Sequence, residues 1–181
     1  MKLIFRQNRM TSMSLRLLVA ILLIGSIARA AGPEQKTDLA PRVITGEMSC
    51  PVCGMYPDRF PQWQTQIIFT DHTGSAFDGG KCMFSFLLNP GQYAPGRNNS
   101  QVTAVWVRDF GSGKWIDGKA ARYVVGSRVM GPMGKELLPF AEQAAAEAFQ
   151  KANGGIIKTY AEINLATIKS LANGGMHMGG H

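Results

Sequence analysis

Phe140-Ala-Glu-Gln-Ala-Ala-Ala-Glu-Ala-Phe-Gln-Lys-Ala-Asn153-Gly-Gly155-Ile-Ile-Lys-Thr-Tyr160 contains the strongest helical pattern in this chain of 181 residues. Six apolar side chains recur at the spacing of one helix face: Phe140, Ala144, Ala145, Ala148, Phe149 and Ala152. Asn153-Gly154-Gly155 is a typical helix end, because glycine accepts the left-handed backbone that follows a C-cap. The stretch therefore predicts a helix over residues 140–153 and a strand over residues 156–160.

The segments on either side extend this pattern into two similar units. The other predicted elements are strands at 63–70, 75–77, 102–110, 114–117 and 122–125, a helix at 81–88 and a last helix at 162–172. Each half of the chain then has the order strand, strand, helix, strand. This order predicts an α+β fold of two small ββαβ units in tandem.

The first thirty residues have the composition of a secretory signal peptide. Basic side chains at Lys2, Arg6, Arg9 and Arg16 precede an apolar run over residues 17–27, and Ala28-Arg29-Ala30 is a typical cleavage site. The run is too short to span a bilayer, which needs about twenty apolar residues. We therefore expect a periplasmic protein with no transmembrane segment in the mature chain. A retained N-terminal anchor is the alternative.

The positive charge of the chain lies mostly in this signal. The sequence has 19 Lys and Arg against 12 Asp and Glu, and five of the basic residues fall within residues 1–30. The mature chain keeps 14 basic and 12 acidic side chains, a net charge of +2, so the composition does not indicate nucleic-acid binding. The organisation that we expect is a signal peptide at 1–30, a flexible leader at 31–47, a first unit at 48–110, a second unit at 111–172 and a flexible tail at 173–181.

Cys50-Pro-Val-Cys53-Gly-Met55 places two thiols and a thioether within six residues. Soft sulfur ligands of this kind select Cu(I) over hard cations. The tail adds Met176, His177, Met178 and His181, which could capture copper in a second site. The chain has three cysteines, an odd number that favours a metal or redox role over structural disulfides.

The chain resembles the NosL family, the periplasmic copper chaperones that serve nitrous oxide reductase. The motifs that carry the resemblance are Cys50–Met55, Asp58–Pro61, Asp78–Phe84, Val107–Phe110, Trp115–Asp117, Ala121–Gly126, Gly131–Gly134, Phe140–Glu142 and Gly154-Gly155 leading to Tyr160–Ile163. They occur in the family's order across nearly the whole mature chain. The resemblance implies a fold similar to that of alkylmercury lyase, built from two ββαβ units.

The resemblance also implies a function. It implies binding of Cu(I) by Cys53, Met55 and Met133, and delivery to nitrous oxide reductase, to its membrane maturation complex or to a similar copper enzyme. Many family members are lipoproteins with a cysteine directly after the apolar run of the signal. This chain has none there, so the sequence favours a soluble periplasmic form over a lipid anchor.

Other functions for the same residues remain open at this stage. Cys50 and Cys53 could form the redox pair of a thiol-disulfide oxidoreductase, and Cys53 with Cys82 could attack an organometallic bond. The single pair makes structural zinc unlikely, because such sites usually have four closed ligands. Cys82 and Met83 suit a helix core, with Cys82 as a secondary metal candidate, and Met130 could replace Met133. The methionines favour a non-enzymatic copper chaperone, because thiol exchange does not need them.

Overall fold

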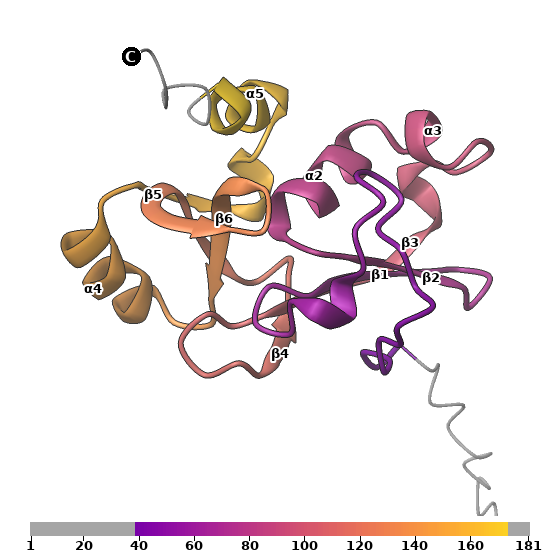
Figure 1. The fold of residues 1–181 in the computed structure, drawn as a ribbon, viewed down its shortest axis with the longest axis horizontal. Helices are drawn as coiled ribbons and strands as arrows, with labels where there is room; N and C mark the ends of the chain where they lie inside the picture. The colour runs from indigo at the N-terminus through magenta and orange to yellow at the C-terminus, as the bar shows by residue number, and fades with distance from the viewer. Residues whose placement is uncertain (1–38, 174–181) are drawn as a thin grey trace, which may run out of the picture. The chain divides into compact units, whose positions relative to one another are not determined.

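The computed structural model describes residues 39–173, which form two antiparallel sheets with a helix between them (Figure 1). One sheet has the strand order β2-β1-β3-β4 and the other has the order β6-β5-β7. The predicted α+β class is confirmed. The signal peptide, residues 31–38 of the leader and the Met/His tail lie outside the described residues, so the division of the chain into domains stays a prediction.

The first sheet follows the ββαβ order predicted for the first half of the chain and adds a fourth strand. Its strands are β1 (Thr65–Phe69), β2 (Gly74–Phe77), β3 (Val102–Arg108) and β4 (Trp115–Asp117), all paired antiparallel. We expected residues 114–117 to open the second unit, and that assignment was wrong. Trp115 pairs with Arg108, so β4 extends the first sheet through the loop of residues 109–114.

The second sheet contains a strand that the sequence pattern did not reveal. Its strands are β5 (Arg122–Gly131), β6 (Gly134–Phe140) and β7 (Ile156–Thr159), and α4 (Gln143–Asn153) connects β6 to β7. Strand β6 lies at the edge of the sheet, where Pro139 is tolerated because no second neighbour needs its missing N–H. The ββαβ order therefore holds: the strand expected at 122–125 is the start of β5, and β6 takes the place of the strand expected at 114–117.

The buried face of α4 also differs from the prediction. Ala144, Ala145, Ala148 and Ala152 are exposed, whereas Ala146 is fully buried and Phe149 is half-buried. Phe140 belongs to the end of β6 and contacts Phe149, with ring centroids 5.1 Å apart. The aromatic rings of Phe110, Phe140 and Phe149 set the helix orientation, because alanine is too small to bury much apolar area.

Helix α2 (Gly80–Leu88) is the centre of the fold. It contacts β1 and β2 of the first sheet and also β6 and α5 (Leu165–Asn173), so both halves of the chain share one core. Phe84 of α2 packs edge-on against Tyr123 of β5, with ring centroids 5.1 Å apart. The remaining short elements are η1 (Pro57–Arg59), α3 (Pro90–Tyr93), η2 (Asn99–Gln101) and η3 (Tyr160–Glu162). Within residues 39–173, no helix has the length and apolar character needed to cross a membrane.

A glycine allows α2 to lie this close to β6. A Cβ on Gly80 would stand 2.7 Å from the carbonyl oxygen of Leu137, which is backbone and cannot turn aside. We expect Gly80→Ala to lower the free energy of unfolding by about 1–3 kcal/mol, the usual range for overpacking. Urea denaturation of the metal-free protein measures this. Gly91→Ala in α3 is the matched control, because a Cβ there meets nothing within 4 Å; equal stability of the two variants would contradict the prediction.

Candidate metal centre

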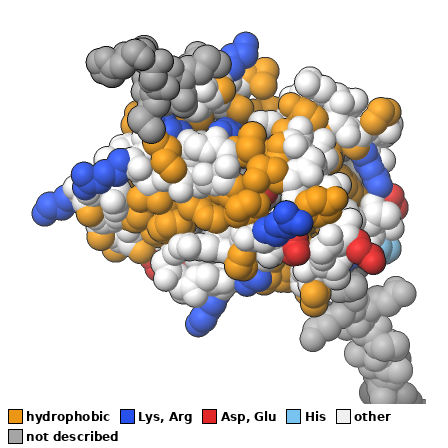
Figure 2. All heavy atoms as spheres, in the orientation of Figure 1, with side chains coloured by type: hydrophobic (Ala, Val, Ile, Leu, Met, Phe, Trp, Pro, Cys, Tyr) orange, Lys and Arg blue, Asp and Glu red, His pale blue; other side chains and the backbone are white. Residues whose placement is uncertain are grey.

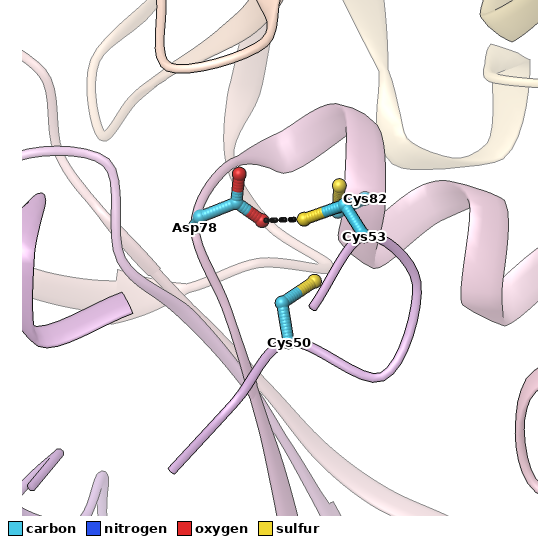
Figure 3. Close-up of side chains that lie close together, drawn as sticks. All are labelled: Cys50, Cys53, Asp78 and Cys82. Carbon is cyan, nitrogen blue, oxygen red and sulfur yellow. Dashed lines mark hydrogen bonds between the residues drawn. The ribbon is translucent and has the colours of Figure 1, made fainter. Parts of the chain in front are cut away.

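Three thiols and one carboxylate converge at the start of α2 (Figure 3). One ligand atom from each of Cys50, Cys53, Asp78 and Cys82 lies within 4.8 Å of all the others. Cys50 and Cys53 come from the loop before η1, Asp78 follows β2, and Cys82 lies in the first turn of α2. The cluster therefore combines segments that are about thirty residues apart in the sequence.

The loop that carries Cys50 and Cys53 folds back on itself. The N–H of Cys50 donates to the carbonyl oxygen of Met55 at 2.7 Å, and the N–H of Gly54 donates to the carbonyl oxygen of Cys50 at 2.9 Å. Gly54 has a φ of 78°, a left-handed backbone that glycine adopts without strain. This short turn directs both thiols toward α2, and it explains why a glycine follows the second cysteine.

Asp78 and Cys82 complete the cluster from the other side. Both side chains are buried, with exposed fractions of 0% and 3%. The interpretation of Cys82 and Met83 as core residues is confirmed, and Cys82 is at the same time a member of the metal-ligating cluster. Asp78 was missed as a ligand candidate. The sequence feature that could have identified Asp78 is its position four residues before Cys82, at the predicted start of a helix. This position brings both side chains to the same end of the helix.

The three thiols differ in their protonation. Hydrogen bonding from Cys82 lowers the pKa of Cys50 to about 7, whereas burial raises the pKa of Cys53 to about 12. The same bond to Cys50 raises the pKa of Cys82 well above its ordinary value. The Cys53 thiol donates to Oδ1 of Asp78 at 3.1 Å, while Oδ2 of Asp78 is buried and has no hydrogen-bond partner within the described residues. The metal-free cluster thus contains one sulfur that readily becomes a thiolate, and metal binding must release protons from the others.

The methionines proposed from the sequence lie at two places. Met55 is half-buried and uses its carbonyl oxygen to close the cysteine loop. Met133 is 42% exposed, in the turn between β5 and β6, and its carbonyl oxygen accepts a hydrogen bond from Nζ of Lys81. Because Lys81 is next to Cys82, this contact holds the turn beside the helix end that carries the cluster. Met130 is more exposed still, and Met176, His177, Met178 and His181 lie outside the described residues.

The donor set fits a soft metal ion. Thiolates and thioethers suit Cu(I), and three cysteines with one carboxylate could also surround a tetrahedral Zn(II) ion. All three cysteines are free thiols. Cys53 is half-buried, so the cluster is reached from solvent through this residue.

Comparisons with known proteins all lead to one family. The sequence profile of the NosL family matches residues 41–168. The copper-binding lipoprotein NosL of Stutzerimonas stutzeri is 30% identical over 173 residues, which cover 89% of this chain and 87% of that protein.

Two solved structures are similar as well. The crystal structure of the copper chaperone NosL from Shewanella denitrificans has a TM-score of 0.62 and 28% identity, covering 71% of this chain and 98% of that one. The solution structure of apo-NosL from Achromobacter cycloclastes is 29% identical, with a TM-score of 0.43, and covers 57% of this chain and 87% of that one.

Proposed function

The chain belongs to the NosL family, and from this membership we propose that it is a periplasmic carrier of Cu(I) for the maturation of nitrous oxide reductase. A carrier holds and releases its cargo without turnover, so no residue is assigned a catalytic role. Family membership favours this function over a thiol-disulfide oxidoreductase or an organometal lyase. The single observation that carries the proposal is the cluster of Cys50, Cys53, Asp78 and Cys82.

We assign the copper ligands from this cluster and the two nearby methionines. Cys50, Cys53, Met55 and Met133 are the proposed ligands, and the position of Cys82 within the cluster adds it as a further donor. Cu(I) needs only two or three sulfur donors at a time, so these five candidates need not all bind at once, and a ligand of the acceptor can replace one of them. Asp78 accepts the hydrogen bond of the Cys53 thiol and so orients this side chain within the cluster.

The partner that we propose is nitrous oxide reductase or its membrane maturation complex. Transfer needs an accessible site, and Cys53 is the proposed exit because it is the least buried of the three thiols. Exposed apolar side chains include Tyr56 and Met133 on the two segments that flank the cluster. Figure 2 shows hydrophobic side chains spread across one face of the molecule, with Lys and Arg around them.

The periplasmic location rests on the signal peptide in residues 1–30, which lie outside the described residues. The Stutzerimonas relative is named as a lipoprotein.

In this chain the first cysteine is Cys50, whose side chain is 98% removed from solvent and belongs to the metal cluster. We therefore propose that Cys50 acts in metal binding.

The proposal is tested by an anaerobic titration of the reduced protein with Cu(I) against a competing chelator. We expect one tightly bound Cu(I) per chain, and we expect Met55→Leu and Met133→Leu each to weaken binding about tenfold, or about 1.4 kcal/mol. Thioether sulfur is a neutral soft donor, so its loss is milder than the loss of a thiolate.

Met48→Leu is the matched control, because Met48 is an exposed thioether that lies outside the cluster. A parallel titration with Zn(II) separates the two metals. Preference for Zn(II) over Cu(I), or a stoichiometry unrelated to these residues, would contradict the assignment of a copper carrier.

A further inference from the structure

Glu136 is a buried carboxylate that the proposed copper site does not use directly. It lies on β6, its side chain is 0% exposed, and its Oε2 accepts a hydrogen bond from the N–H of Lys81 at 2.8 Å. The same oxygen lies 3.4 Å from the N–H of Leu137, and Oε1 has no hydrogen-bond partner within residues 39–173. A charged group without full pairing is expensive to bury, so its position needs a physical reason.

Two glycines leave the space that this carboxylate occupies. A Cβ on Gly79 would stand 2.8 Å from Oε1 of Glu136, and a Cβ on Gly131 would stand 2.5 Å from its Cγ. Gly79 precedes α2, whereas Gly131 ends β5 at the turn that carries Met133. The side chain is therefore enclosed between the helix end with the cysteine cluster and the turn with the proposed methionine ligand.

Lys81 makes a second connection between the same two segments. Its backbone N–H binds Glu136, and its Nζ donates to the carbonyl oxygen of Met133. The stretch from Met133 to Glu136 is thus held at both ends by the residue that directly precedes Cys82. Two contacts to one residue fix both the distance and the direction of the turn relative to the cluster.

We propose that Lys81 and Glu136 form a clamp that positions Met133 as a copper ligand beside the cysteine cluster. Neither side chain contacts the metal, and both act through the place that they give to Met133. This inference rests on the proposed function, because it takes Met133 to be a ligand. Residues that orient metal ligands typically contribute 10- to 100-fold to metal affinity.

A double-mutant cycle tests the clamp. We expect Lys81→Ala to weaken Cu(I) binding about tenfold, as Met133→Leu does, and we expect the double variant to be no weaker than either single one. Glu136→Ala should behave like Lys81→Ala, whereas Glu136→Gln keeps an acceptor for the Lys81 N–H and should stay within about threefold of the wild type. Lys81 is at the surface, so its variant tests the clamp even if Glu136→Ala does not fold.

X-ray absorption at the copper edge of selenomethionine-labelled protein gives a readout that a general loss of stability does not change. Lys81→Ala should lose the same Cu–Se contact that Met133→Leu loses. Lys135→Ala is the control, because it removes an equal charge from the same hairpin and leaves the contact between Lys81 and Met133 in place.

The outcomes separate the clamp from the function. If Met133→Leu weakens binding but Lys81→Ala does not, or if their effects add, the clamp is wrong and the copper site stands. If Met133→Leu has no effect while the cysteine variants do, Met133 is not a ligand and the clamp is also wrong. Absence of tight Cu(I) binding in the unaltered protein would overturn the proposed function itself.

Discussion

Cys53→Ser is expected to weaken Cu(I) binding by more than about 100-fold, beyond the range typical of residues that only support a metal site. Cys53 has the most accessible sulfur of the cluster, and its thiol is held toward Asp78 by a hydrogen bond of 3.1 Å. A serine hydroxyl is a hard donor that keeps its proton near neutral pH, so it cannot replace a thiolate at Cu(I). Competition with a chelator under anaerobic conditions measures the change.

Companion variants determine how the other thiols contribute. Cys50→Ser and Cys82→Ser in the same assay show whether two or three sulfurs hold the ion, because all three lie within 4.8 Å of one another. Retention of affinity within tenfold in Cys53→Ser would place the copper elsewhere. His177→Ala with His181→Ala would then test whether the C-terminal tail holds it.

Glu136→Gln is expected to stabilise the metal-free protein at pH 8 by up to about 3 kcal/mol and to have little effect below pH 4.5. Burial raises the pKa of Glu136 from 4.5 to about 7. The folded state therefore holds the proton more tightly than the unfolded state does. The stability that protonated Glu136 contributes is complete below about pH 4.5 and is lost as the pH rises through about 7.

Glutamine imitates the protonated form, so the variant should lack this pH dependence. Urea denaturation of the reduced, metal-free protein at pH 4.5, 6 and 8 gives the comparison. Glu147→Gln, on the exposed side of α4, is the control for loss of a surface charge. If the free energy of unfolding differs between Glu136→Gln and the wild type by the same amount at all three pH values, the charge of Glu136 does not determine the stability difference.

The sequence predicted the elements whose side chains follow a regular pattern. The strand around Ile67 was predicted from the alternation over residues 63–70, and the helix over residues 81–88 was predicted because most of its side chains are apolar. Strand β6 was not predicted, because Lys135, Glu136 and Pro139 interrupt any alternation of apolar and polar side chains. Its conformation depends instead on its contacts with a neighbouring strand and helix, which the sequence pattern does not reveal. The buried face of α4 was misjudged for a similar reason, since the partner rings come from distant segments.

The metal cluster was predicted in part. Cys50 and Cys53 are close in the sequence, so their spacing indicated a site directly. Asp78 and Cys82 reach them only through the fold, and a lone carboxylate before a helix has many ordinary roles. The same holds for Glu136, whose importance depends on contacts 55 residues away along the chain.

The unequal environments of the cysteines have a consequence for the empty carrier. Electrophiles and oxidants attack thiolates, and they need access to the sulfur. Here the sulfur with the lowered pKa, Cys50, is almost fully buried, and the accessible one, Cys53, keeps its proton. The most nucleophilic sulfur and the most accessible sulfur are thus different atoms, so the metal-free protein should resist adventitious disulfide exchange under oxidising conditions. The three thiols of the metal-free cluster should therefore stay reduced and able to bind a metal ion.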